Sequence, residues 1–270
     1  MEILERVSEV LEIIKMRKPL VHHMTNFVTA NDCANVTLAI GASPIMAYDE
    51  KEVEEVVSMS SSLILNIGTL TSNDIKSMII AGRKANELNI PVILDPVGVG
   101  ATNLRTKSIE DILENVSVSV IKGNMSEIKS ISGLDVNIRG VDSIADDDNG
   151  EAVAQELASK LECIIAITGK RDIISDGNRV FCINNGDERL SRITGTGCMT
   201  GSLIASYCGV TRDYLIGAIG GILSMGIAGE IAANLLKVDK GIGSYKVSLF
   251  DSIYNLYTEN IIKIGEIYEQ

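Results

Sequence analysis

Short apolar runs alternate with segments of helical length along the first half of the chain, and this order constrains the fold more than any other feature. Apolar runs that end in Gly, Pro or polar turns predict strands at 19–25, 43–47, 62–68, 91–97 and 117–124. The remaining segments predict helices at 2–16, 31–41, 49–61, 72–88 and 107–115. Because parallel strands need a long crossover between them, usually a helix, the alternation predicts a parallel sheet covered by helices on both faces.

The second half of the chain has a different spacing. Three strand-like runs follow one another closely and are separated by turns, as in antiparallel hairpins at a sheet edge: 163–169, 171–177 and 179–186. Helices are expected from Gly197 onward. The acidic stretch 145–152 is expected to be an exposed loop before a helix, and the neighbouring segment 135–150 has no motif that we can interpret. We therefore predict one α/β domain over residues 1–270, with a mainly parallel sheet, helices on both faces and antiparallel hairpins at the edge.

Composition supports this fold class and narrows the choice of partners. Apolar residues make up 46% of the chain and aromatic residues only 4%, so the core is aliphatic, which suits a sheet between helices. The formal net charge of −12 is not offset by a basic cluster, which argues against nucleic-acid binding. An acidic protein still binds ATP when its phosphate site is local and built from backbone amides, a few cations and a metal.

Cysteine spacing and hydropathy indicate a reduced, soluble, cytoplasmic protein. The five cysteines are odd in number, widely spaced and never in a CxxC pair, which argues against a disulfide framework or a zinc site. The amino-terminal segment mixes charged with apolar residues and lacks the apolar stretch of a signal peptide. The longest uncharged run, 214–229, is short for a membrane span and predicts a buried, closely packed helix.

A glycine-punctuated turn, ITGTGC at 193–198, runs directly into an apolar helix of small residues. Gly195 and Gly197 allow the backbone to approach an anion, and the N–H groups of 195–198, which include Thr196 and Cys198, would open into one concavity at the positive helix end. Such an anion hole suits a phosphoryl group during transfer. The alternative is an ordinary helix start with glycines for close packing.

Two carboxylates follow predicted strands and are candidate magnesium ligands. Asp95 precedes Pro96, and Glu127 lies in an NxxE arrangement with Asn124 in the first turn of a helix. Two carboxylates with water and phosphate oxygens satisfy Mg²⁺, which keeps much of its hydration shell. Alone, each residue also has a simpler explanation, because Glu suits the first turn of any helix and Asp before Pro is common in turns.

Three further polar positions have weaker signals. Lys122 follows a strand and could lie against ATP phosphates, and Thr168 ends another strand and could contact phosphate or ribose; a solvated lysine and a satisfied strand-end threonine are the alternatives. His22 and His23 are adjacent strand residues that face opposite ways, so they cannot share a metal ion, and we interpret them as structural or peripheral.

Eight motifs occur over about 20–210 and again near the carboxyl terminus: LVHHMTNFVTAN, GASPIMAY, LILNIGTL, IPVILDPVGVGAT, IKGNMSEI, IAITG, TGTGCMTGS and DKGIGSYKV. In this order and spacing they resemble the hydroxyethylthiazole kinase family of the ribokinase-like superfamily. GTGC is the most specific of them, because the wider superfamily usually has Asp at its last position. The resemblance implies a ribokinase-like fold and a homotrimer with active sites between subunits.

The resemblance also implies an activity and residue roles. The activity is Mg²⁺-dependent transfer of the ATP γ-phosphoryl group to the hydroxyl of 4-methyl-5-(2-hydroxyethyl)thiazole, in thiamine biosynthesis or salvage. The implied roles are thiazole binding by Asn26, Met46, Gly68 and Gly195, catalysis in the turn Gly195–Cys198, ATP binding by Lys122, Asn124 and Thr168, and metal binding by Asp95 and Glu127. At position 122 the family commonly has Arg, and Lys keeps the charge but loses the bidentate fork.

Cys198 stands where relatives on this fold have a carboxylate. We expect the positive end of the helix to lower the pKa of its thiol, so that it accepts the alcohol's proton or orients the hydroxyl; a small buried thiol without a chemical role is the alternative. Rival functions on the same fold are a hydroxymethylpyrimidine or pyridoxal kinase and an ATP/ADP-dependent NAD(P)H-hydrate dehydratase. We expect the dehydratase to carry Asp in place of Cys198.

Overall fold

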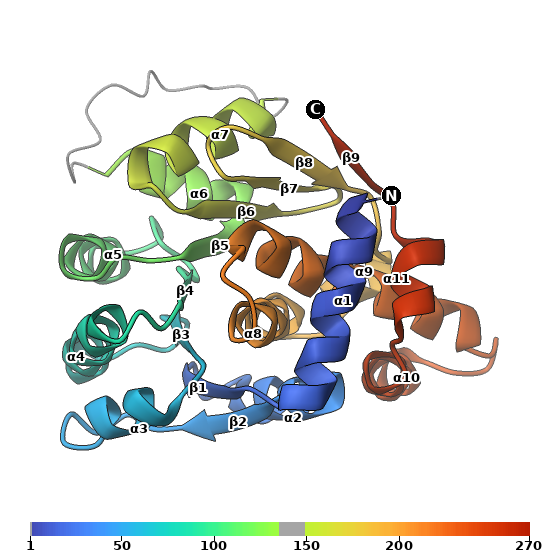
Figure 1. Ribbon diagram of the computed structural model, residues 1–270, viewed down its shortest axis with the longest axis horizontal. Helices are drawn as coiled ribbons and strands as arrows, with labels where there is room; N and C mark the ends of the chain where they lie inside the picture. The colour runs from blue at the N-terminus through green and yellow to red at the C-terminus, as the bar shows by residue number, and fades with distance from the viewer. Residues whose placement is uncertain (1, 135–148) are drawn as a thin grey trace.

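The fold is a nine-stranded sheet between two layers of helices, seen in a computed structural model that describes residues 2–134 and 149–270 (Figure 1). The strand order is β2-β1-β3-β4-β5-β6-β7-β8-β9. The strands are β1 (Leu20–Met24), β2 (Ser43–Met46), β3 (Ser62–Asn66), β4 (Val92–Asp95), β5 (Val120–Asn124), β6 (Ile164–Thr168), β7 (Asp172–Ser175), β8 (Val180–Ile183) and β9 (Ile267–Glu269).

Strands β1 to β6 pair in parallel, and β6 to β9 pair antiparallel. The predicted parallel sheet with antiparallel strands at one edge is therefore confirmed. The final strand β9 was not expected, because the sequence predicted only helices after Gly197. The segment IYE is short and mostly exposed, so only its pairing with β8 identifies it as a strand.

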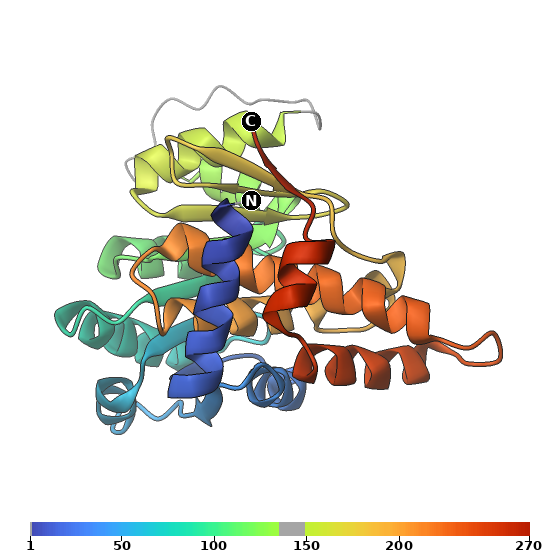
Figure 2. The same ribbon diagram turned by 45° about the vertical axis from the view of Figure 1, so that its right-hand side comes forward.

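One helical layer packs the amino-terminal helix against the long carboxy-terminal helices (Figures 1 and 2). This layer consists of α1 (Glu2–Arg17), α2 (Ala30–Ile40), α8 (Thr196–Cys208), α9 (Tyr214–Leu235), α10 (Ile242–Tyr254) and α11 (Thr258–Ile264). The other face carries α3 (Val53–Met59), α4 (Ser72–Glu87), α5 (Asn103–Asn115), α6 (Met125–Ser132) and α7 (Gly150–Leu161), and a short 3₁₀ helix, η1 (Glu188–Arg192), precedes α8.

Strand periodicity divides the core into two parts. Ile64 packs in the core under α8 and α9, whereas its neighbours Leu63 and Leu65 pack in the core under α3 to α7. All three side chains are almost completely buried. A strand buried on both faces is apolar throughout, which explains why SLILN has no polar alternation until its last residue.

Local signals set several helix ends. Gly41 closes α2 with φ of 103°, the left-handed conformation that favours glycine, as the sequence predicted. Helix α5 begins four residues earlier than predicted because the Thr102 side chain accepts the N–H of Arg105 and caps it. Helix α7 begins at Gly150, so residues 150–152 are helical, and the exposed loop expected over 145–152 is wrong there. Residues 145–148 and most of segment 135–150 lie outside the described residues.

Helix α9 is the buried helix predicted from the uncharged run at 214–229. It is the one helix among the described residues that is long and apolar enough to cross a membrane, but 89% of its most apolar window is buried inside the protein. Glycines let it approach α8 closely: a Cβ at Gly221 would lie 2.5 Å from the backbone nitrogen of Ile204. This packing fixes α8 over the sheet.

We expect Gly221→Ala to lower the free energy of unfolding by about 1–3 kcal/mol, because the added methyl group meets α8 backbone that cannot move aside. Gly243→Ala in α10 is the matched control, since nothing lies within 4 Å of its Cβ position, and its stability should stay within about 1 kcal/mol of the wild type. Urea denaturation followed by circular dichroism measures both. Equal stability of the two variants would contradict this account of the α8–α9 contact.

Candidate active site

Five strands end at a residue that the sequence analysis singled out, or close to one. Met46, Asn66, Asp95, Asn124 and Thr168 are the last residues of β2, β3, β4, β5 and β6. Pairing places Asn66 opposite Asp95 and Asn124 opposite Thr168. Because parallel strands end at the same edge, the sheet gathers these side chains on one side of the molecule.

The turn at the start of α8 lies over this edge. Gly195 is the N-cap residue with φ of 89°, and a Cβ there would lie 2.5 Å from Cγ2 of Thr29, so only glycine fits. The first helical bond runs from the N–H of Met199 to the carbonyl of Gly195, 2.8 Å away. The N–H groups of Thr196, Gly197 and Cys198 thus precede the helical ladder, at the positive end of the helix.

A buried ion pair supports the turn from below. Nζ of Lys122 lies 3.4 Å from Oδ1 of Asp95 and 3.0 Å from the carbonyl oxygen of Gly197. Burial opposes the charge of Lys122, but Asp95, Cys198 and Glu127 together raise its pKa; burial also raises the pKa of Asp95, against the stabilising charge of Lys122. Lys122 is only 4% exposed and contacts protein oxygens, so its contact with nucleotide phosphates stays a prediction.

Asn66 joins the two sides of the site, and sequence reasoning missed it. Its Nδ2 lies 2.8 Å from Oδ2 of Asp95 and 3.2 Å from Sγ of Cys198, and its Oδ1 accepts hydrogen bonds from Asn26 and from the N–H of Gly68. The available signal was a polar residue that closes an otherwise apolar strand, the same signal that identified Asp95. Arg105 was missed too; its guanidinium donates to the carbonyls of Ile67 and Gly68 and holds that loop.

The predicted thiazole residues Asn26 and Gly68 lie together beside Cys198. Nδ2 of Asn26 lies 3.4 Å from Sγ of Cys198, and a Cβ at Gly68 would lie 3.0 Å from both Asn26 and Asn66. Met46 is partly exposed at the end of β2, two strands away from β3. Their roles in thiazole binding stay predictions.

The expectation of a lowered thiol pKa is wrong. Burial and the charge of Asp95 raise the pKa of Cys198, and Lys122 with the hydrogen bonds from Thr29 and Asn66 only partly offsets them. The sequence showed the helix end but could not show the buried carboxylate nearby. At neutral pH the side chain is therefore mainly a thiol.

Glu127 and Asn124 form a capping box at the start of α6. Oε2 of Glu127 accepts the N–H of Asn124, and Oδ1 of Asn124 accepts the N–H of Glu127. Oε1 of Glu127 accepts the N–H of Gly98, 2.9 Å away. Glu127 therefore suits the first turn of its helix, which was the simpler explanation for this residue. Each of its carboxylate oxygens still keeps a free lone pair, and the side chain is partly exposed.

The carboxylates fit Mg²⁺ only as an ion held largely by water and phosphate. Glu127 is accessible, whereas Asp95 is completely buried between Lys122 and Asn66. Within residues 2–134 and 149–270, no group of three or more His, Cys, Asp or Glu could hold a metal ion. One or two carboxylates with phosphate oxygens are the usual magnesium arrangement in phosphoryl-transfer enzymes.

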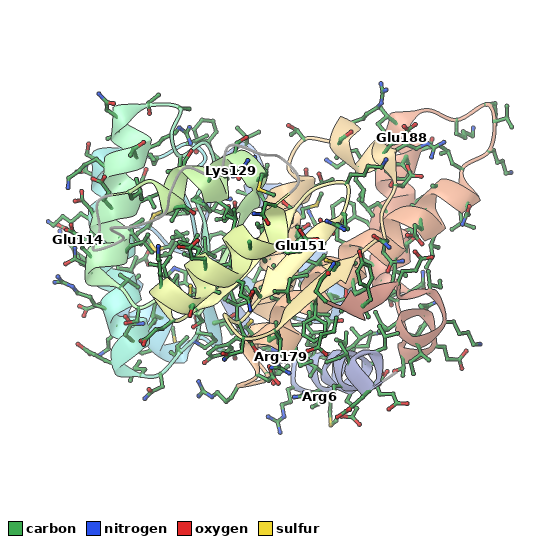
Figure 3. All side chains as sticks on the ribbon, turned by 90° about the horizontal axis from the view of Figure 1, so that it is seen from above. Arg6, Glu114, Lys129, Glu151, Arg179 and Glu188 are labelled. Atoms are coloured by element: carbon green, nitrogen blue, oxygen red, sulfur yellow. The ribbon has the colours of Figure 1, made fainter. Side chains whose placement is uncertain are left out.

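A cavity of about 760 Å³ opens next to the turn. Thr168, Thr196 and Gly197 line it together with residues of η1, of α9 and of the segment 184–187 that follows β8. Seen from above, the labelled Glu188 of this lining lies on the side of the molecule where α9 and α10 project, far from Glu114 on α5 (Figure 3). Asp172 also lines the cavity, and burial raises its pKa to about 7 despite the N–H of Gly169 and the charge of Lys122.

The histidines are structural, as predicted. Burial lowers the pKa of His23 to about 4, and its ring contacts Ser202 and Thr37. Nε2 of His22 bonds the carbonyl of Ala47. Both are neutral core residues at physiological pH.

The family model for "Hydroxyethylthiazole kinase family" matches residues 11–259, nearly the whole chain. The chain belongs to the hydroxyethylthiazole kinase family. It is 55% identical to the hydroxyethylthiazole kinase of Alkaliphilus oremlandii over 100% of both chains, and 52% identical to that of Clostridium beijerinckii over 99% of both.

Solved structures agree with membership in the hydroxyethylthiazole kinase family. The hydroxyethylthiazole kinase protein of Pyrococcus horikoshii superposes with a TM-score of 0.89 at 37% identity, covering 98% of this chain and 99% of that one. The pyridoxal kinase of Staphylococcus aureus and the NAD(P)H-hydrate dehydratase of Bacillus subtilis reach TM-scores of 0.61 and 0.55 at 14% identity, and these show only the shared ribokinase-like fold.

We expect Lys122→Met to lower the free energy of unfolding by about 3–5 kcal/mol at neutral pH, because it leaves the buried Asp95 carboxylate without its cation. The matched control is Lys107→Met, which removes an exposed lysine from its pairs with Glu110 and Asp111 and should leave the stability almost unchanged. Denaturant titrations measure both.

The pH dependence of Lys122→Met distinguishes this cause from lost packing. Without Lys122, Asp95 in the folded protein binds its proton at a higher pH than in the unfolded chain, so stability should fall as pH rises from 5 to 8. Adding Asp95→Asn should remove this slope and recover stability. A destabilised single variant whose stability does not depend on pH would contradict the ion-pair explanation.

Proposed function

We propose that this protein transfers the γ-phosphoryl group of ATP to the hydroxyl of 4-methyl-5-(2-hydroxyethyl)thiazole. The observation that carries the proposal is the position of the turn 195–198. Gly197 lines the large cavity, which suits a nucleotide, while the next residue, Cys198, faces Asn26 and Asn66. The amides at the start of α8 thus lie between a nucleotide site and an alcohol site, where a migrating phosphoryl group needs stabilisation.

The transfer needs positioning and charge more than proton abstraction. The alcohol oxygen forms a bond to the γ-phosphorus, the bond to the bridging oxygen breaks, and ADP leaves, through a loose transition state. The turn amides and the positive charge of Lys122 beneath them stabilise the equatorial oxygens. Because the pKa of Cys198 is raised, we assign its sulfur the role of orienting the hydroxyl, whose proton departs late.

We propose that Mg²⁺ accompanies the nucleotide. When bound, it neutralises charge on the phosphates. Glu127 would hold the ion, partly through water, and the negative charge of Asp95 would add to the field behind it without direct contact. Asn124 and Thr168, at neighbouring strand ends, would contact ATP beside the cavity.

We also propose a cytoplasmic homotrimer with active sites between subunits. Apolar side chains near the site are strongly exposed: Phe27 is 80% exposed, and Val28, Leu38, Val247 and Tyr254 are each more than half exposed. These residues precede or lie on α2 and α10, two helices that pack together. Exposed apolar side chains on two helices that pack together are typical of subunit contacts.

We expect ADP release from MgATP in the presence of the thiazole alcohol, and at least tenfold less with a hydroxymethylpyrimidine or pyridoxal, because specificity of this size follows from one or two unsatisfied polar contacts. Omitting Mg²⁺ should abolish turnover. A coupled ADP assay measures all of these conditions. A preference for another alcohol would support one of the rival kinases, and dehydration of a hydrated nicotinamide nucleotide would support the lyase.

We expect Cys198→Ala to keep measurable turnover and Cys198→Asp to remain active. The alanine variant keeps turnover because positioning and electrostatics provide most of the rate acceleration. The aspartate variant remains active because a carboxylate accepts the hydroxyl's hydrogen bond as sulfur does. Single-turnover kinetics measures both variants. A folded, ATP-binding Cys198→Ala protein with no turnover would contradict the orienting role.

A further inference from the structure

We propose that Asn66 is a positioning residue whose amide fixes the sulfur of Cys198 as a hydrogen-bond acceptor beside the substrate's hydroxyl. The assignment of that hydroxyl rests on the proposed function. Asn66 ends β3, is only 2% exposed, and uses both amide atoms within the site. The motif LILNIGTL contains it, but the sequence analysis gave Asn66 no role.

The backbone determines which way the Asn66 amide faces. The N–H of Gly68 lies 2.9 Å from its Oδ1, and because a backbone N–H only donates, the atom there must be the oxygen. Nδ2 then faces Oδ2 of Asp95 at 2.8 Å and Sγ of Cys198 at 3.2 Å. The two N–H bonds of one amide are therefore shared between the carboxylate and the sulfur.

Asn26 is oriented by the same logic. Its Oδ1 accepts the backbone N–H of Thr29 at 3.0 Å, so its Nδ2 faces Oδ1 of Asn66 at 3.0 Å and Sγ of Cys198 at 3.4 Å. Hydrogen bonds thus run in one direction, from Thr29 through Asn26 and Asn66 to Asp95. Both asparagines direct a remaining N–H toward the sulfur.

Two amide donors make the sulfur an acceptor within its site. The ionisable groups that act on it are Asp95 from β4, Lys122 from β5 and Cys33 from α2. With its proton directed away from the two N–H groups, the sulfur accepts a further hydrogen bond from the alcohol O–H. An alcohol that donates its proton in this way keeps an oxygen lone pair free for the phosphorus, which is the geometry that attack requires.

Asn66→Asp separates the donor role from a structural role. The new side chain is isosteric and its Oδ1 still accepts from Gly68 and Asn26, while its other oxygen would face Oδ2 of Asp95 at 2.8 Å and share a proton with it, so that no donor remains for Cys198. We expect iodoacetamide to alkylate Cys198 up to about fivefold more slowly at fixed pH. A factor of this size corresponds to the loss of one hydrogen bond. Mass spectrometry of the peptide with Cys198 gives the rate, and the other four cysteines are buried.

Matched variants separate the lost donor from added charge or misfolding. Asn178→Asp adds the same charge on the exposed turn before β8 and should leave alkylation unchanged. Asn66→Leu removes the donor without charge, and Asn26→Asp removes the second donor while keeping the acceptor for Thr29; both should slow alkylation. Unchanged rates in the folded Asn66 and Asn26 variants, or slowing by Asn66→Asp alone, would overturn the proposal.

A double-mutant cycle tests the effect on turnover. Asn66→Asp should lower kcat with the thiazole alcohol at least tenfold with little change in the KM for ATP, and should have almost no further effect in the Cys198→Ala background, because the two residues act as one unit. Equal losses in both backgrounds would show that Asn66 acts independently of Cys198. If the wild type does not phosphorylate the thiazole alcohol, the proposed function fails, while the alkylation rates still decide the role of Asn66.

Discussion

The common direction of strands β1 to β6 is the constraint on which the rest of the structure depends. Parallel strands all end at one edge of the sheet, so six chain segments each present their last residue there. Helix α8 then starts over the same edge, held by close contact between its backbone and the glycines of α9. The glycine turn 195–198 and the strand-end polar residues meet because of these two features.

The electrostatics of the site are local and differ from those of the whole protein. The chain has a net charge of −12, yet the turn 195–198 lies above a lysine that is sealed from solvent. Lys122 is held by Asp95 and by the carbonyl of Gly197, so its charge is fixed close to the turn amides. Burial and the charge of the same carboxylate raise the pKa of Cys198, which supports our proposal that the thiol orients the hydroxyl instead of acting as a base.

Much of the fold could be predicted because burial on both faces makes parallel strands continuously apolar. The run SLILN, for example, identified β3 without ambiguity, and the uncharged run at 214–229 identified α9. Strand β9 could not be predicted, since IYE has no apolar period and becomes a strand only by pairing with β8. The start of α5 was missed because its capping threonine follows a Gly-rich segment that resembles a loop throughout.

The site was only partly determined by the sequence itself. Residue types and their places at strand ends identified Asp95, Asn124, Thr168 and the glycine turn, because these depend on local sequence and on the direction of the strands. Side-chain partners were decided by the tertiary structure alone: the Lys122–Asp95 pair, the orientation of the Asn66 amide and the pKa of Cys198. The physical reason is that hydrogen bonds and desolvation depend on distances between segments far apart in the chain, such as the 132 positions that separate Asn66 from Cys198.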